Sequence, residues 1–175
     1  MEIKEFTSIS LDRVLSSVRL TLDGMTAEQL AYRPHPEANS VAWVMWHLTR
    51  GLDRRVAMLD GAEQTWVADR VYEQFNLPAD PDDYGVGHNA EQVAAVRPRD
   101  ASLLLDYYES VHGRMRVFLD GLKPDDVDRP VADPSTGEGS TVGNILADAV
   151  NGNLQHIGQA GYIRGLIEGR RWFPR

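Results

Sequence analysis

Apolar residues recur every three or four positions in four long stretches of this chain. That period is typical of helices that bury one face, because 3.6 residues complete one helical turn. Polar residues suited to cap a helix, Ser40 and Thr141, precede the second and the fourth stretch. The predicted helices cover residues 10–23, 41–60, 101–121 and 142–169. Four long helices of comparable length predict an all-α fold, an antiparallel four-helix bundle.

The segments between these helices are less regular. Thr26 begins a capping-box pattern that predicts a short helical turn, and Pro124 precedes two aspartates that predict another. Residues 62–89 are predicted to form short helix with an ordered loop, or a lid, because long bare loops are uncommon in compact domains. Residues 130–139 predict a loop, and no stretch alternates between apolar and polar residues as a strand does. We therefore predict one helical domain, residues 1–175.

Length and composition agree with a globular domain that folds without a structural metal. The chain has 175 residues, 42% of them hydrophobic, and a chain of this size buries roughly 70% of its unfolded surface. Its net charge of −8 argues against nucleic acid or an anionic membrane as a partner. The first six residues interleave charges, and the apolar cluster at residues 41–48 is far shorter than the ~20 residues that cross a bilayer. We expect a cytoplasmic protein.

The absence of some residues and motifs excludes several chemistries. The chain contains no cysteine, which excludes disulfides, cysteine zinc ligands and a thiol nucleophile of its own. Thiol chemistry would therefore need a thiol that is supplied from outside. No GxSxG, GxGxxG or Walker pattern is present, so neither serine hydrolase nor nucleotide chemistry has support.

Histidine remains as the residue type for chemistry, because neutral imidazole is the commonest metal ligand and the usual base near neutral pH. Of the five histidines, His47 lies at the edge of the apolar stripe of the second helix, and His156 lies within that of the fourth. Two inward histidines on different helices are a candidate pair for one metal, since bundle sites use facing helices. The alternative is that both are core histidines that bind nothing, because no dense motif such as HExxH accompanies them.

Other residues are predicted to lie near this pair. Gly152 lies one turn before the histidine of the fourth helix, where a small residue leaves room for water, a ligand or a large neighbour. Trp43 and Trp46 flank the histidine of the second helix, either as core residues or as walls of an apolar pocket. His88 belongs to a glycine-rich loop and is either exposed or directed into a site.

Four segments together resemble the DinB-like superfamily, and in particular its thiol-dependent transferases that act with mycothiol or bacillithiol. They span nearly the whole chain and comprise residues 32–34 (YRP), 39–48 (NSVAWVMWHL), 82–88 (DDYGVGH) and 154–165 (LQHIGQAGYIRG). The second and fourth segments are fairly specific in combination. The resemblance implies a four-helix bundle, often a homodimer. It also implies action on a small-molecule substrate with a low-molecular-weight thiol and a divalent metal, zinc or nickel.

The resemblance further implies a metal site of three residues. Its first ligand falls on His47 and its last on His156, but the middle one falls on Gly152, which has no side chain to bind a metal. Asp148, one turn further back, and His88, in its loop, are the replacements that the sequence offers. Two hypotheses follow: a metal-dependent thiol S-transferase, or a metal-free bundle that has lost its third ligand. The second would serve as a scaffold for a small ligand or a protein partner.

Overall fold

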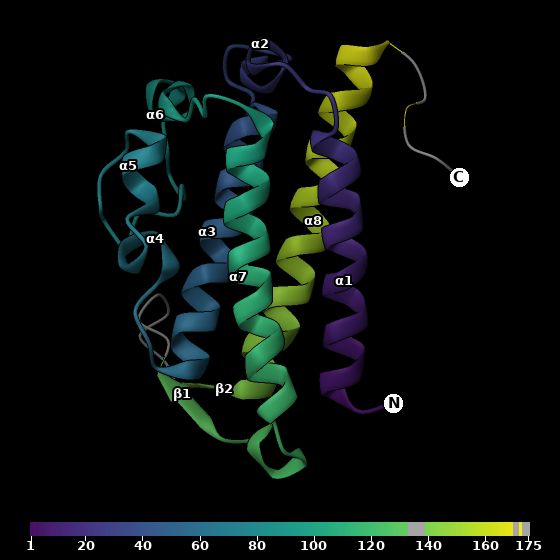
Figure 1. Cartoon of the computed structure of the whole chain (residues 1–175), viewed down its shortest axis with the longest axis vertical. Coiled ribbons are helices and arrows are strands. Elements are labelled where there is room, and N and C mark those ends of the chain that lie inside the picture. The colour runs from purple at the N-terminus through teal and green to yellow at the C-terminus, as the bar shows by residue number, and fades with distance from the viewer. Residues whose placement is uncertain (133–138, 170–171, 173–175) are drawn as a thin grey trace.

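The computed structural model describes residues 1–132, 139–169 and 172, and it confirms the prediction of a mostly helical fold. Four long helices lie side by side (Figure 1), and α1 and α3 each pack against both α7 and α8. These long helices are α1 (Ile3–Leu22), α3 (Val41–Asp60), α7 (Ala101–Gly121) and α8 (Val142–Glu168). The shorter elements are α2 (Ala27–Ala31), α4 (Thr65–Ala68), α5 (Val71–Phe75), α6 (Ala90–Ala95) and the 3-10 turn η1 (Pro124–Asp126).

The long helices do not simply alternate in direction. In Figure 1, α1 runs upward, α3 and α7 both run downward, and α8 runs upward again. Residues 61–100 cause this order, because they carry the chain from the lower end of α3 back to the upper end of α7. The antiparallel arrangement predicted from the sequence therefore holds for α1 with α7 and for α3 with α8, but α3 is parallel to α7 and α1 is parallel to α8.

Two further features differ from the sequence prediction. The first helix begins at Ile3 instead of residue 10, because the inward position one turn before Leu11 is Thr7, which is buried but polar and so breaks the apolar pattern. Two antiparallel strands, β1 (Pro130–Ala132) and β2 (Gly139–Thr141), also pair where the sequence predicts a loop. Strands of three residues are too short to show alternation. Residues 133–138 of that predicted loop lie outside the described residues.

Side-chain caps begin the two helices that carry the candidate histidines. The Ser40 hydroxyl accepts a hydrogen bond from the Trp43 N–H at 3.1 Å, and the Thr141 hydroxyl accepts one from the Asn144 N–H at 3.3 Å. Each cap pairs an otherwise unpaired N–H of the first turn. The predicted starts of α3 and α8 are confirmed, and so is the capping box at Thr26.

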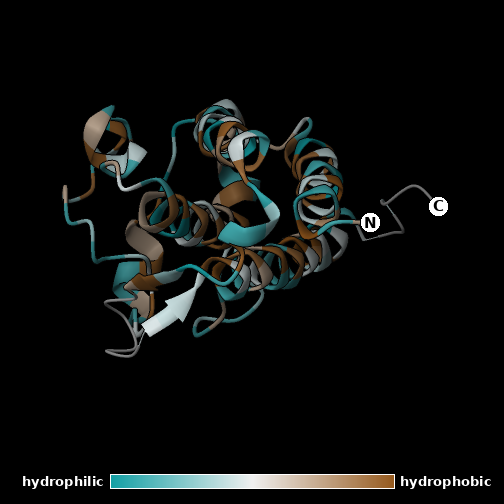
Figure 2. Ribbon diagram, turned by 90° about the horizontal axis from the view of Figure 1, so that it is seen from below, coloured by the Kyte–Doolittle hydropathy of each residue, from teal (hydrophilic) through white to brown (hydrophobic). Residues whose placement is uncertain are grey.

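The hydrophobic core lies between the long helices. Figure 2 views these helices nearly end-on and shows much of their hydrophobic surface turned toward one another. Of the four long helices, α3 is the most deeply buried. Its first six residues, 41–46, are all buried. Among the described residues, no helix is both long and apolar enough to pass through a bilayer.

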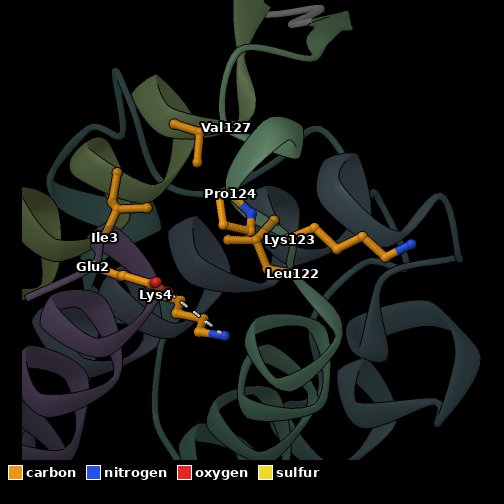
Figure 3. Close-up of a pocket in the computed structure, with 7 residues that line it drawn as sticks. All are labelled: Glu2, Ile3, Lys4, Leu122, Lys123, Pro124 and Val127. Carbon is orange, nitrogen blue, oxygen red and sulfur yellow. Dashed lines mark ion pairs between the residues drawn. The ribbon is translucent and has the colours of Figure 1, made fainter.

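A cavity of about 200 Å³ lies where α1 begins and α7 ends (Figure 3). Its lining consists of Glu2, Ile3, Lys4, Leu122, Lys123, Pro124 and Val127. The lining is largely aliphatic, and Lys4 forms an ion pair with Glu2 at 3.7 Å. No histidine lines this cavity, and the candidate histidines lie on α3 and α8.

Candidate functional site

His47 is fixed on three sides by its neighbours. Its ring stacks on Trp43 with 4.8 Å between ring centroids and 9° between planes, and on Tyr84 with 6.0 Å and 13°. Its Nδ1 is hydrogen-bonded to the carbonyl oxygen of Tyr84. Because a carbonyl oxygen can only accept, Nδ1 carries the proton and the lone pair of the neutral ring resides on Nε2.

Burial keeps the His47 ring neutral. Desolvation is the largest influence and lowers the pKa of His47 from 6.5 to about 4, although the hydrogen bond to Tyr84 opposes it. The charges of His156 and Arg55 lower the pKa of His47 further. At neutral pH the imidazole is therefore in the form that binds a metal or accepts a proton.

The structure brings His156 next to His47. Their ring centroids are 4.5 Å apart and their planes meet at 83°, edge toward face. His156 Nδ1 lies 3.3 Å from Oε1 of Gln159, and an amide oxygen again requires the proton on Nδ1. The described residues offer no hydrogen-bond partner to Nε2 of either ring. The pair predicted from helical spacing is thus assembled, with both Nε2 lone pairs unused.

His156 differs in one respect from its predicted place. The sequence places it within the apolar stripe of the last helix, but the structure places Asn153 and Ile157 there and leaves His156 half-buried at the edge. Asn153 is accommodated in the core because its side chain accepts a hydrogen bond from the Tyr108 hydroxyl at 3.0 Å. It also donates to the Ala149 carbonyl at 2.7 Å.

The predicted third ligand position has no protein donor. A Cβ atom at Gly152 would meet no other atom within 4 Å, so open space adjoins this residue. Asp148 is exposed on α8. No group of three or more His, Asp or Glu residues in the described part of the chain is placed to hold a metal ion.

His88, the other replacement offered by the sequence, has both ring nitrogens engaged. Its Nδ1 accepts a hydrogen bond from the Trp43 indole N–H at 3.1 Å, and its Nε2 lies 2.8 Å from Asp83 Oδ1. The ring also stacks on that of Trp46, with 5.6 Å between the ring centroids. His88 therefore joins its loop to α3 and has no lone pair left for a metal.

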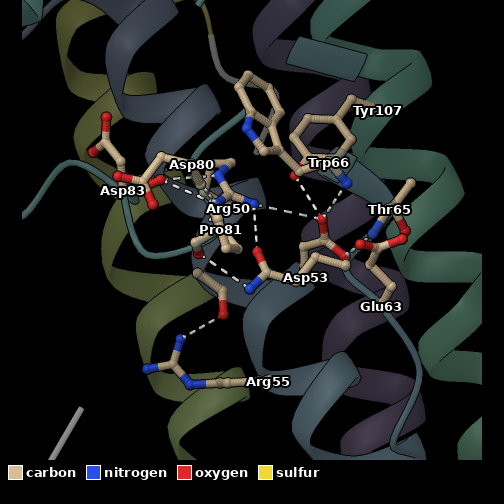
Figure 4. A network of polar contacts seen from close by, with 12 residues as sticks. Arg50, Asp53, Arg55, Glu63, Thr65, Trp66, Asp80, Pro81, Asp83 and Tyr107 are labelled. Carbon is tan, nitrogen blue, oxygen red and sulfur yellow. Dashed lines mark hydrogen bonds and ion pairs between the residues drawn. The ribbon is translucent and has the colours of Figure 1, made fainter. Parts of the chain in front are cut away.

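Arg50, which no sequence motif marks, anchors the loop of residues 80–88 through Asp80, Pro81 and Asp83 (Figure 4), and Tyr84 of this loop contacts His47. Its side chain is 0% exposed and donates to the carbonyl oxygens of Asp80, Pro81 and Asp83 at 3.0 to 3.2 Å. It also donates to Gln64 Oε1 at 2.7 Å. A buried guanidinium needs this many acceptors, because an unpaired buried charge is strongly unfavourable.

Asp53 extends the same network toward α4 and α7 (Figure 4). Its carboxylate accepts hydrogen bonds from the N–H groups of Thr65 and Trp66 at 2.9 and 2.8 Å, and from the Tyr107 hydroxyl at 2.8 Å. Burial raises the pKa of Tyr107 well above its usual value, so this hydroxyl stays a donor. The sequence does carry one sign of this network. Arg50 and Asp53 are three residues apart within a helix whose first residues are apolar, where charged residues are unexpected.

Gly85 allows the loop to approach His47 closely. Its φ of +96° is a conformation that residues with a side chain rarely adopt. A Cβ atom there would lie 2.8 Å from the ring of Trp43, 2.9 Å from that of Trp46 and 3.2 Å from Nδ1 of His47. The glycine of this loop is therefore required by the packing over the site.

The fold and this site define a helical-bundle protein with a pair of facing histidines on two of its long helices. A model of the DinB superfamily matches residues 10–160, so the chain belongs to the DinB superfamily. Among solved structures, a crystal structure of a conserved protein from Enterococcus faecalis is 29% identical to this chain. The match covers 97% of this chain and 99% of that one, with a TM-score of 0.86. A search of curated proteins finds no match. None of these comparisons names a reaction, so the thiol-dependent branch stays a prediction.

Proposed function

We propose that this chain is a metal-dependent enzyme that joins a small-molecule substrate to a low-molecular-weight thiol or separates the two. The observation that best supports this function is the facing pair of His47 and His156, each with Nδ1 hydrogen-bonded and Nε2 without a described partner. Proteins commonly orient metal-binding histidines in this way, through a hydrogen bond from the other ring nitrogen. Zinc or nickel suits two imidazole ligands. The proposal includes one cytoplasmic four-helix-bundle domain that forms a homodimer.

Two residues of this chain, His47 and His156, are suited to be ligands of such a metal. Catalytic zinc usually has three protein ligands and a water, and Gly152 contributes none. The open space beside Gly152 leaves room for a donor that comes from outside the chain. A thiol is a suitable donor, because a bound divalent metal lowers the pKa of a thiol and favours the thiolate. A chain without cysteine has no thiol of its own that would compete.

The protein residues supply binding and orientation. His47 and His156 would hold the metal through Nε2. The rings of Trp43 and Tyr84 stack on the His47 ring, so they fix its direction. The carbonyl of Tyr84 keeps the proton on Nδ1, which maintains the ligand-competent tautomer.

A metal-free scaffold is the second candidate function. It is favoured by the glycine at the third ligand position and by the lack, among the described residues, of a three-residue group that could hold a metal. In this form the chain would bind a small ligand or a protein partner through the same face. Stoichiometric metal binding separates the two candidates.

The test measures metal binding by protein purified without a histidine tag. One equivalent of zinc or nickel is added, with and without 2-mercaptoethanol as a neutral thiol, and bound metal is determined after dialysis. We expect about one metal per chain in the wild type with the thiol present, and loss of binding in His47→Ala and in His156→Ala. His35→Ala is the control, because His35 is an exposed turn residue. No stoichiometric metal under either condition would contradict the enzyme proposal, and equal binding by both alanine variants would contradict the ligand assignment.

Gly152→Asp and Gly152→His test the missing ligand directly. A Cβ atom at position 152 would meet no other atom within 4 Å, and each of these side chains would add a donor one turn from His156. We expect metal affinity to increase by about tenfold or more, because the site gains a third protein ligand. An unchanged affinity with normal folding would show that position 152 does not adjoin the metal.

A further inference from the structure

Side chains pack directly on three of the glycines of α8. A Cβ atom at Gly143 would meet the side chain of Val127 at 2.9 Å. Cβ atoms at Gly161 and Gly165 would meet the indole of Trp172 at 3.2 and 3.4 Å. The indole N–H also donates to the Gly161 carbonyl at 2.8 Å. At these positions another group of the same chain occupies the space that the missing side chain leaves.

Gly152 and Gly158 differ, because a Cβ atom at either position would meet nothing within 4 Å. The space at Gly152 adjoins the histidine pair and belongs to the candidate site. Gly158 is exposed and lies two residues after His156, about 160° around the helix axis, so its space faces away from that site. A glycine in the interior of a helix is destabilising relative to alanine. Among the described residues, no group of this chain packs on Gly158 to offset that cost.

The surface around Gly158 is apolar and uncharged. Leu154 and Tyr162, one turn before and one turn after it, are 52% and 71% exposed. Between Asp148 and Arg164 the helix contains no Asp, Glu, Lys or Arg, although these residues make up 25% of the chain. The exposed side of α7, by contrast, carries two aspartates. We call Leu154, Gly158 and Tyr162 the outer face of α8.

α1 packs along α8 and enlarges this apolar surface (Figure 1). It adds the exposed side chains of Phe6, Ile9 and Leu20, so six of the ten exposed large apolar residues in the described part of the chain lie on these two helices. Glu5 and Arg13 are exposed on α1, which confines charge to the α1 side of the surface. Twenty residues of helix are about 30 Å long and about 10 Å wide, so the two helices offer about 600 Å² in outline. That outline is close to the roughly 800 Å² of accessible surface that each partner buries in a standard interface.

We propose that the outer face of α8 binds a second copy of this chain, with the two α8 helices antiparallel and crossing at Gly158. A two-fold axis at this crossing places Leu154 of one copy opposite Tyr162 of the other. The two glycines meet at the axis, where the lack of side chains lets the helix backbones approach closely. A large residue, a gap and a large residue at one-turn spacing are therefore complementary to the same pattern on another copy.

Charge favours a second copy over a partner of opposite charge. Each chain carries a net charge of −8, so two copies repel each other least where the contact surface has no charge. A basic partner would bind an acidic face, which the outer face of α8 is not. This inference rests on the homodimer that the proposed function includes, and it adds the interface. Because His156 lies on the other side of α8, the contact leaves the histidine pair open, and metal binding can be measured separately.

The test measures the oligomeric state of the full, metal-free chain by sedimentation equilibrium. We expect a dimer that dissociates in the micromolar range, and we expect Leu154→Arg to raise its dissociation constant at least about tenfold, because each copy would bury an unpaired guanidinium. Val117→Arg is the matched control, since Val117 is a 74% exposed apolar residue on α7 that receives the same charge. Circular dichroism verifies that both variants fold.

Gly158→Gln tests the close approach of the two helices. A Cβ atom at this position meets nothing in the chain itself, and glutamine favours a helix more than glycine does, so the fold should be at least as stable as in the wild type. The added side chain would hold the two copies apart, and we expect the dissociation constant to increase at least about tenfold. Gly113→Gln is the matched control, because Gly113 is exposed within α7 and a Cβ atom there also meets nothing within 4 Å.

The outcomes separate this interface from the proposed metal-dependent function. A wild-type chain that remains monomeric at several hundred micromolar would overturn the interface, and so would a dimer in which either α8 variant associates as well as its α7 control. Metal binding by the histidines would be unaffected by those results. Conversely, a dimer that both α8 variants dissociate, in a protein that takes up no metal, would retain the interface and contradict the metal-dependent function.

Discussion

His47 and His156 face each other, but their surroundings hold them in opposite ways. The ring of His47 is stacked on those of Trp43 and Tyr84, and its Nδ1 is hydrogen-bonded to the backbone of a loop that is distant in sequence. The ring of His156 is half-buried, and the partner of its Nδ1 is the side chain of Gln159 on the same helix. Residues 61–100 lie beside α3, whereas no such segment lies outside α8 (Figure 1) among the described residues.

This difference indicates a division of roles between the two helices. A group that must keep one tautomer and one direction needs neighbours that cannot move, and α3 provides them. A group that must admit a ligand needs open space, and α8 provides it beside Gly152. The site therefore combines a preorganised half with an accessible half, and variants of each half should have effects of different size.

The largest loss of stability is expected from Arg50→Met, which removes the anchor of the preorganised half of the site. The variant leaves three loop carbonyls and Gln64 without their donor, and it removes one of the two arginines that neighbour the buried carboxylate of Asp53, the other being Arg114 at 3.8 Å. Removal of one partner from such a buried network should lower the free energy of unfolding by about 3–5 kcal/mol. Urea unfolding followed by circular dichroism measures this change.

Arg13→Met is the control for Arg50→Met, because it deletes the same side chain from an exposed position on α1. We expect a change within about 0.5 kcal/mol for this control. If the two variants were equally stable, the network seen around Arg50 would not hold the loop, and the contrast between the two halves of the site would lose its cause.

Gly85→Ala should have the next largest effect, because it tests the contact between the loop and the aromatic residues of α3. Gly87→Ala is the matched control, since Gly85 and Gly87 both have positive φ, +96° and +80°, but a Cβ at Gly87 would meet nothing within 4 Å. The backbone strain is similar in both variants, so their difference measures the clash with Trp43, Trp46 and His47. We expect Gly85→Ala to be less stable than Gly87→Ala by about 1–3 kcal/mol in thermal or urea unfolding.

Equal stability of the two alanine variants would show that the loop can move away from α3 without cost. In that case the ring of His47 would not be fixed by the loop. The variants also differ in a second observable, because displacement of Tyr84 in Gly85→Ala alone should alter the tautomer of His47, which nitrogen NMR detects.

The sequence predicts the part of this molecule that depends on helical periodicity. The starts of α3 and α8 follow from caps and apolar stripes, and His47 and His156 meet at the edges of these two stripes. The start of α1 is missed because a buried threonine, Thr7, takes an inward position. The parallel direction of α3 and α7 is missed because it depends on the path of residues 61–100, which have no period.

The preorganised half of the site could not be predicted from the sequence, because its contacts join residues that are far apart in the chain. Arg50 binds carbonyl groups about 30 positions later, and backbone carbonyls carry no mark in the sequence. Gly85 is visible as a loop glycine, but the tryptophans that would clash with its Cβ belong to α3. His88 is visible as a loop histidine, and only its two partners, Trp43 and Asp83, show that it is structural.

The smallest effect is expected from pH, and it measures how well His47 is shielded from water. Burial keeps the pKa of His47 at about 4 in the folded chain, compared with 6.5 as the ordinary value. Between these two pH values the unfolded chain binds more protons than the folded one, so the free energy of unfolding decreases as the pH falls from 6.5 to 4. Allowing for the partial exposure of the ring, we expect His47 to account for about 1–2 kcal/mol of this decrease.

The contribution of His47 is isolated by comparison with His47→Gln, which removes the titrating group. Burial also lowers the pKa of His112, so the wild type retains a second group that acts in the same direction, and only the difference between wild type and variant is assigned to His47. Urea unfolding at several pH values should show a shallower decrease in His47→Gln. In NMR, the ring signals of His47 should remain unchanged above about pH 5, because a pKa near 4 leaves the ring neutral there. Titration near pH 6.5 would mean that water reaches the ring, and the two histidines would then be held alike.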